Sequence, residues 1–185
     1  MKRFVSLGFL VMAACAHEER RSSAASDPEA IAKLEAKSGS TVTGQAELFV
    51  AREQVTLKLE VENMSPGTHA LHFHEKGDCS SSDGESAGDH WNPGNVAHGH
   101  LQHPPSHLGD MGNLEVGADG RGTLDFTTTV WTVGSGTDTD VVGKALVIHG
   151  GKDDLVSQPA GNSGPRIACG VVRAAKGAPV ASATR

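Results

Sequence analysis

The segment QVTLKLEVEN, residues 54–63, alternates apolar and polar side chains with a period of two. Successive side chains of an extended strand point to opposite faces, so Val55, Leu57, Leu59 and Val61 share one face. The pattern predicts a strand with one face packed on a core and the other facing water.

Similar short runs lie on both sides of this segment, separated by the turn signals SGS, SPG and ADG. We expect these further strands at residues 30–37, 41–50 and 67–75, in a hairpin over 113–130, and at 143–151 and 168–174. Two irregular stretches, 76–109 and 152–166, interrupt the pattern, and loops of this length usually carry function. The sequence therefore predicts an all-β fold, an eight-stranded antiparallel Greek-key sandwich or barrel with two long functional loops.

The composition fits this fold class and excludes some partners. The 185 residues include 23 glycines and 8 prolines, only 4% are aromatic, and the net charge is −6. An acidic chain makes neither nucleic acid nor an anionic membrane surface an obvious partner.

The first residues read as a secretory signal. Lys2 and Arg3 precede an apolar run over 4–12, and small residues lead to Cys15. The order resembles a bacterial lipoprotein cleavage site, which makes Cys15 a lipidation candidate. We expect a signal peptide over 1–14, a tether over 15–29, a folded domain over 30–174 and a flexible tail over 175–185.

Export to an oxidising compartment would allow the other two cysteines to form a disulfide. If Cys15 belongs to the processing site, Cys79 and Cys169 remain as a natural pair in an oxidising compartment. The alternative is two unrelated thiols.

Two histidines stand close together in ALHFHEKGDC, residues 70–79. In a strand His72 and His74 share one face, while Leu71 and Phe73 share the face toward the core. They are either a pair of metal ligands or two histidines whose ring nitrogens are hydrogen-bonded on a polar strand face. The segment alone does not decide between these two interpretations.

Histidines are concentrated where the strand pattern stops. Seven of the ten lie between His72 and His107, followed closely by Asp110. Neutral imidazole is the commonest metal ligand, and a carboxylate can complete such a site. A nonspecific chelating patch would have a similar composition, so the spacing must separate the two.

The spacing resembles that of copper/zinc superoxide dismutase over roughly residues 30–174. The motifs that carry the resemblance are HFHEKGDC, AGDHWNP, HLGDMGN, VIHGGKDDL and GNSGPRIACGV. The zinc loop of that family has a histidine, a second eight residues later, a third nine after that and an aspartate three further on. His90, His98, His107 and Asp110 reproduce every interval.

The resemblance implies two metals. It implies copper on His72, His74, His90 and His149. It implies zinc on His90, His98, His107 and Asp110, with His90 bridging the metals through both ring nitrogens. Four imidazoles suit Cu(II), and three histidines with one aspartate suit tetrahedral zinc.

Other positions take roles from the same family. Asp153 is expected to accept hydrogen bonds from the non-ligating nitrogens of His72 and His98. His69 is expected to be structural, and His100 and His103 are spare loop histidines.

The implied reaction is the disproportionation of superoxide to oxygen and hydrogen peroxide. Copper is alternately reduced and oxidised, and His90 takes up a proton and donates it in the second half. Arg166 matches the family arginine beside the copper and is expected to attract the anion. Lys76 and Lys152 are weaker candidates for the same task.

The expected partners are superoxide and, through a lipidated Cys15, a membrane. The resemblance leaves monomer and homodimer open and implies a location in the cell envelope or periplasm. The alternatives to catalysis are an exported copper- or zinc-binding module and a structural adhesion sandwich. Complete ligand sets together with Asp153 and Arg166 favour the enzyme.

Overall fold

A computed structural model describes residues 27–175 of the chain. The expected signal peptide, Cys15, most of the tether and all but the first residue of the tail lie outside this range. Among the described residues there is no helix of the length and apolar character needed to span a membrane.

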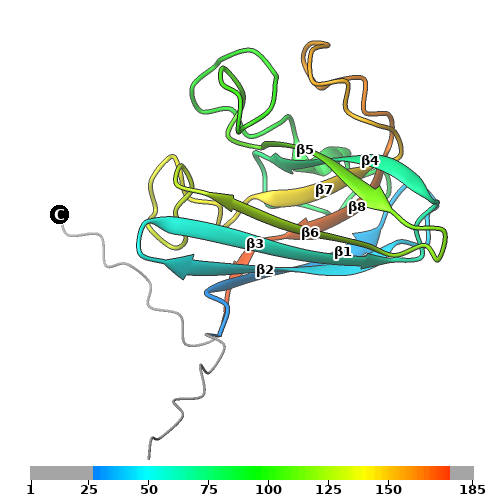
Figure 1. Ribbon diagram of the computed structural model, residues 1–185, viewed down its shortest axis with the longest axis horizontal. Coiled ribbons are helices and arrows are strands. Elements are labelled where there is room, and N and C mark those ends of the chain that lie inside the picture. The colour runs from blue at the N-terminus through cyan, green and yellow to red at the C-terminus, as the bar shows by residue number, and fades with distance from the viewer. Residues whose placement is uncertain (1–26, 176–185) are drawn as a thin grey trace, which may run out of the picture.

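Within residues 27–175, nine strands and one short 3₁₀ helix make up the regular structure (Figure 1). They are β1 (Ala30–Ala36), β2 (Thr43–Ala51), β3 (Gln54–Glu62), β4 (Gly67–His74), η1 (Glu85–Ala87), β5 (Asp110–Val116), β6 (Gly122–Thr128), β7 (Ala145–His149), β8 (Arg166–Val171) and β9 (Arg173–Ala174). The expected hairpin on ADG is the connection between β5 and β6.

The first eight strands form one closed antiparallel sheet. Its order is β2-β3-β6-β5-β4-β7-β8-β1, and β1 pairs back with β2 while the two-residue β9 adds to β1. Three consecutive strands, β4 to β6, return beside β3, which is a Greek-key arrangement. The predicted eight-stranded Greek-key barrel is confirmed, and closure leaves few free strand edges.

The core fills the inside of this barrel. The inward side chains of β3, Val55, Leu57, Leu59 and Val61, are all buried, as their alternation predicted. Phe73 from β4 packs edge-on against Trp131, with ring centroids 5.1 Å apart.

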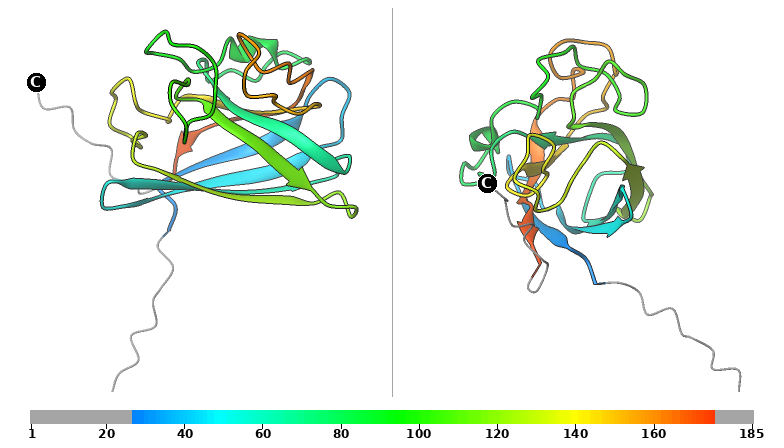
Figure 2. Two further views of the ribbon diagram at one scale, coloured as in Figure 1. Left: turned by 45° about the horizontal axis from the view of Figure 1, so that its top comes forward. Right: turned by 90° about the vertical axis from the view of Figure 1, so that its left-hand side faces the viewer.

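The two long loops, 75–109 and 150–165, rise on the same side of the barrel (Figures 1 and 2). They cover the outer face of β4, which is buried on both faces from His69 to His74. Leu71 and Phe73 belong to the core, and His72 and His74 point the other way, under the loops. The long loops therefore enclose a polar layer outside the apolar barrel.

Candidate metal centre

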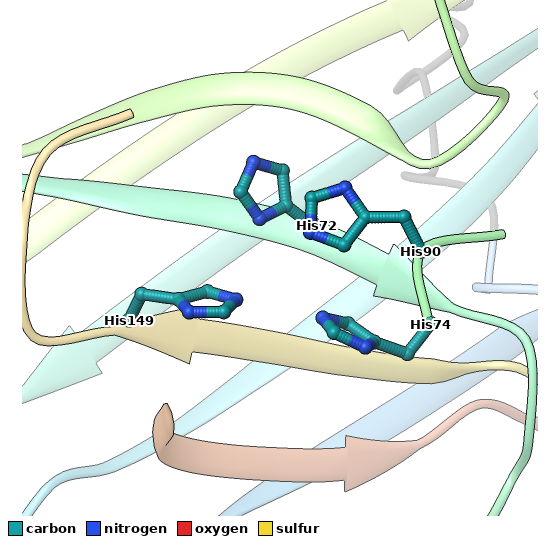
Figure 3. Close-up of side chains that lie close together, drawn as sticks. All are labelled: His72, His74, His90 and His149. Atoms are coloured by element: carbon teal, nitrogen blue, oxygen red, sulfur yellow. The ribbon is translucent and has the colours of Figure 1, made fainter. Parts of the chain in front are cut away.

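The first cluster of the polar layer consists of four buried histidines (Figure 3). His72 and His74 come from β4 and His149 from the end of the adjacent β7, while His90 comes from the loop and pairs with the backbone of His74. Each offers one ring nitrogen, and these four nitrogens lie within 4.8 Å of one another.

The other nitrogen of three of these rings is held by a hydrogen bond. His74 Nδ1 donates to the carbonyl of Gly88 at 2.9 Å, and His149 Nδ1 donates to that of Gly164 at 3.1 Å. His72 Nε2 donates to Asp153 Oδ2 at 2.7 Å. These bonds fix the tautomers, so His74 and His149 present Nε2 and His72 presents Nδ1 to the centre of the cluster.

The inward nitrogens of the first cluster have no hydrogen-bond partner. They are His72 Nδ1, His74 Nε2, His90 Nε2 and His149 Nε2. Burial lowers the pKa of His72 to about 4 and that of His149 to about 3, so both rings are neutral at pH 7. Four unshared electron pairs that converge in a buried space fit a cation that prefers nitrogen ligands.

The second cluster is built around Asp110 at the start of β5. Three ring nitrogens surround its carboxylate: His90 Nδ1 at 2.9 Å, and His98 Nδ1 and His107 Nδ1 each at 3.1 Å. The backbone N–H groups of Gly99 and His107 donate to Asp110 Oδ2, both at 2.9 Å, and hold the carboxylate in place.

The tautomers in this cluster require a positive charge at its centre. His98 Nε2 donates to Asp153 at 3.0 Å and His107 Nε2 donates to the carbonyl of Val96 at 3.1 Å. In the neutral rings, the Nδ1 lone pairs then face the Asp110 carboxylate, and either a proton on the ring or a bound cation makes this arrangement favourable. Zinc–ligand distances of about 2.0 Å in a tetrahedron separate neighbouring ligands by about 3.3 Å, close to the spacings observed.

Titration of the second cluster shows the same demand for positive charge. Burial lowers the pKa of His98, but the carboxylates of Asp110 and Asp153 outweigh it and raise the pKa to about 9. Burial raises the pKa of Asp110, but the three surrounding rings and the Gly99 N–H hold it well below its usual range. The cluster therefore keeps its carboxylate ionised at every pH near neutrality.

Asp153 connects the two clusters. Its two oxygens accept separately from His72 and His98, and its backbone exchanges hydrogen bonds with the side chain of Asn113. Gly161 lies against it with φ +64°, and a Cβ there would clash with Asp153 Oδ1. Only glycine allows the loop to close on this carboxylate.

Two irregularities in strand pairing lie next to the clusters. Between β4 and β5 the register shifts so that His72 pairs with Asp110, and between β7 and β8 it shifts so that His149 pairs with Arg166. Bulges of this kind redirect a side chain next to a site. The strand pattern of the sequence did not predict either one.

A cavity of about 900 Å³ opens on the outer side of the first cluster. The rings of His74, His90 and His149 line it, together with Arg166, whose side chain is 11% exposed. The arginine is near enough for its charge to contribute to the lowered pKa of both His74 and His149, after burial and neighbouring histidines. The first cluster thus has one face that a small anion can reach.

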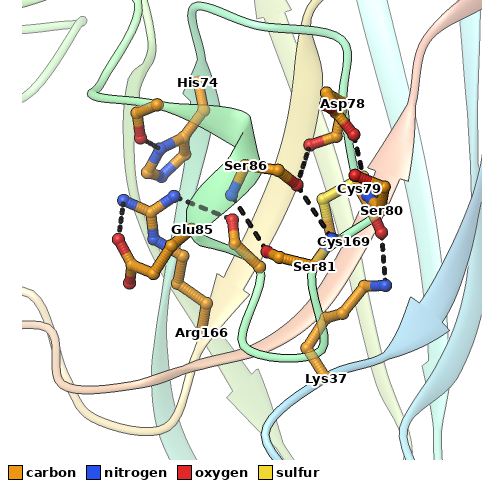
Figure 4. The surroundings of a disulfide bond; sticks show 12 residues. Lys37, His74, Asp78, Cys79, Ser80, Ser81, Glu85, Ser86, Arg166 and Cys169 are labelled. Carbon is orange, nitrogen blue, oxygen red and sulfur yellow. Dashed lines mark hydrogen bonds and ion pairs between the residues drawn. A yellow bond between two sulfur atoms is a disulfide. The ribbon is translucent and has the colours of Figure 1, made fainter.

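Cys79 and Cys169 form a disulfide (Figure 4). It joins the loop that follows β4 to the middle of β8, and the predicted pairing is confirmed. Lys37 Nζ donates to the carbonyl of Cys79, and the N–H of Ser38 donates to that of Ser82 at 2.7 Å, which fastens the loop at further points.

We expect reduction of this disulfide to lower the melting temperature by about 10 °C. The bond closes a separation of 90 residues, for which loop entropy gives about 4–5 kcal/mol as an upper figure. Calorimetry of the metal-free protein with and without reductant measures the shift, and Cys79→Ser/Cys169→Ser, insensitive to reductant, is the control. An unchanged melting temperature would contradict a structural role.

The remaining sequence candidates lie elsewhere. His69 contacts the carbonyls of His149 and Ser65 and joins neither cluster. His100 and His103 lie 5.5 Å apart between ring centroids and also stand outside both clusters.

The cations near the cavity differ from those singled out in the sequence. Lys76 lines it but lies 3.6 Å from Glu75, and Lys152 is exposed outside the lining. Lys144, which sequence reasoning missed, lines the cavity and sits 5.4 Å from the centre of the Trp91 ring. No motif marks it, because only the fold brings the residue before β7 to this wall.

Comparisons with a protein family, with curated sequences and with solved structures all find similar proteins. Residues 42–172 match the family described as copper/zinc superoxide dismutase (SODC). A superoxide dismutase [Cu-Zn] of Aquifex aeolicus is 42% identical over 134 residues, 70% of this chain and 79% of that protein. A copper chaperone for superoxide dismutase from Rattus norvegicus is 37% identical over 139 residues, 70% of this chain but 47% of the chaperone. The crystal structure of the clock protein EA4 superposes with a TM-score of 0.72 at 29% identity, covering 82% of this chain and 98% of that one.

Proposed function

Because the chain belongs to the copper/zinc superoxide dismutase family, we propose that its first histidine cluster holds copper and its second holds zinc. The protein is an enzyme that converts two superoxide ions and two protons into oxygen and hydrogen peroxide, with copper and zinc as cofactors. What carries the residue assignment is the set of six buried ring nitrogens without partners, which face two centres that share His90.

The copper ligands in this proposal are His72 Nδ1, His74 Nε2, His90 Nε2 and His149 Nε2. Four imidazole nitrogens suit Cu(II), and the cavity leaves one face of the cluster accessible to substrate. The zinc ligands are the Nδ1 atoms of His90, His98 and His107 with Asp110. All four side chains of this set are buried, as the ligands of structural zinc sites are.

Copper supplies the one-electron redox chemistry when bound, and zinc supplies a fixed positive charge. His90 spans the two clusters, so its Nε2 can take up a proton while its Nδ1 stays on the zinc side, and it can then deliver the proton to the reduced dioxygen. Asp153 orients His72 and His98 through their outer nitrogens, which couples the geometry of the two sites.

Arg166 is proposed to bind the anionic substrate at the open face. Its guanidinium carries five N–H groups and stays charged at all relevant pH values. Only part of this donor set is used, by the Gly84 carbonyl and Glu85. The remaining N–H groups can align a dioxygen anion beside the copper cluster.

Superoxide decay in the presence of protein loaded with one copper and one zinc tests this function. We expect rapid catalysed decay. The rival function is a module that stores or delivers metal, and the similarity to a copper chaperone is the observation that favours it. A protein with full metal content that does not accelerate decay, yet transfers copper to another protein, would establish the rival.

The disulfide and the similarity to bacterial superoxide dismutases indicate an exported protein. We further propose cleavage after residue 14, a lipid on Cys15, and a tether over 15–29 that carries the domain from the membrane of the cell envelope. A tail over 175–185 completes the proposed organisation.

Cys15→Ser is expected to move the protein from the membrane fraction to the soluble fraction of the cell envelope. One thioether-linked lipid site is removed and the folded domain is untouched, so activity per molecule should not change. Fractionation followed by immunoblotting measures this. A wild-type protein that is already soluble would rule out the lipid anchor.

A further inference from the structure

The guanidinium of Arg166 is held by two consecutive residues of the loop that follows β4 and carries Cys79 (Figure 4). Its Nη1 donates to the carbonyl of Gly84 at 2.9 Å, and its Nη2 lies 3.2 Å from Glu85 Oε2. The arginine side chain is 11% exposed and that of Glu85 is 64% exposed. A solvent-accessible carboxylate therefore sits directly on the arginine proposed to attract the substrate.

This contact is built into a stiff segment. The disulfide anchors the loop at Cys79, and Ser81 and Ser86 tie it together by reciprocal hydrogen bonds from the backbone N–H of each to the hydroxyl of the other, at 3.1 and 3.0 Å. Glu85 begins the 3₁₀ helix that follows. These bonds hold the backbone of Glu85 beside Arg166.

The other charges around the cavity decide how much the pairing of Glu85 with Arg166 affects an incoming anion. Besides Glu85, the lining carries three carboxylates, of Glu75, Asp89 and Asp138. The lining cations are Lys76, Lys144 and Arg166. The mouth therefore has no excess of positive charge, although the substrate is an anion, and among the lining carboxylates Glu85 is the one paired with Arg166.

We propose that Glu85 is a positioning residue that orients the Arg166 guanidinium and lowers its attraction for anions. Glu85 is the exposed partner of this pair, and an ion pair with one partner in water contributes little to stability. The carboxylate competes with incoming anions for Nη2, which limits occupation of the open face by inorganic anions at the expense of the superoxide rate. This inference rests on the proposed role of Arg166.

Glu85→Gln tests the proposal in the metal-loaded enzyme, because glutamine keeps an acceptor oxygen for Nη2 and removes only the charge. Asp138→Asn is the matched control, since it removes the same charge from the same cavity lining, where Asp138 makes no ion pair with Arg166. We expect Glu85→Gln to tighten azide binding, followed by copper absorbance, about threefold and to raise the superoxide rate at low ionic strength about twofold. Its rate should also fall more steeply with added salt, while Asp138→Asn changes each quantity less.

The outcomes separate this inference from the role of Arg166. Suppose that Arg166→Ala weakens azide binding, but that Glu85→Gln binds azide no more tightly than Asp138→Asn does. Then only the inference about Glu85 is overturned, and the role of Arg166 stands. If Arg166→Ala leaves azide affinity and rate unchanged, the proposed role of Arg166 fails and the inference fails with it. The metal content and the melting temperature of Glu85→Gln should match those of the wild type. If Glu85→Gln binds azide more weakly than the wild type does, the proposal is also overturned.

Discussion

Replacing His90 with alanine will deprive the protein of both metals. The ring presents Nε2 to the first cluster and Nδ1 to Asp110 in the second, so one substitution removes a proposed ligand from each. Loss of a single ligand from a four-ligand site weakens metal binding by orders of magnitude. We therefore expect less than about one tenth of the wild-type copper and zinc after dialysis, and superoxide turnover lower by at least about a hundredfold.

Two control variants show whether the loss of both metals is specific to His90. Asp110→Ala should empty the second cluster first and leave copper bound, because Asp110 contacts no ring of the first cluster except the shared His90. His100→Ala should leave both metals in place, because His100 stands outside both clusters. A His90→Ala protein with full copper, full zinc and normal turnover would show that this residue is not the bridge.

Arg166→Ala will slow the enzyme at least about tenfold at low ionic strength while copper and zinc content stay near normal. The side chain belongs to neither cluster, so its loss removes anion attraction and alignment, together with its contacts to Gly84 and Glu85, but no residue of either cluster. Electrostatic steering raises association rates by about 10- to 1,000-fold. Stopped-flow or pulse-radiolysis measurement of superoxide decay gives the rate.

Salt separates steering from other effects of this substitution. The Debye length is about 10 Å at 0.1 M, so the wild-type rate should fall as ionic strength rises and the variant should start lower and fall less. Arg166→Glu should be slower than Arg166→Ala, because it repels the substrate. Unchanged turnover and anion affinity in a fully metallated Arg166→Ala protein would contradict the assignment.

The sequence could predict much of the fold because alternation in a strand depends on local geometry. The apolar face of β3 and the opposite faces of Phe73 and His74 follow from a period of two. The intervals from His90 to Asp110 were informative because they match those of a known family, and the structure brings these four side chains together. The disulfide followed from counting cysteines in an exported chain.

What the sequence could not predict depends on contacts made only in the folded chain. Register shifts pair His72 with Asp110 and His149 with Arg166, and alternation within one strand carries no information about them. The carbonyls of Gly88 and Gly164 that set two tautomers are backbone groups without a side-chain signature. No motif in the sequence marks Glu85, and only the fold places it beside Arg166.

Anomalous diffraction from crystals of the metal-loaded protein, recorded at the copper and zinc absorption edges, tests the central claim most directly. The claim is that two different metals share the imidazole of His90. The prediction is one copper peak among His72, His74, His90 and His149, and one zinc peak among His90, His98, His107 and Asp110. A single peak, both metals in one cluster, or a metal without contact to His90 would contradict it.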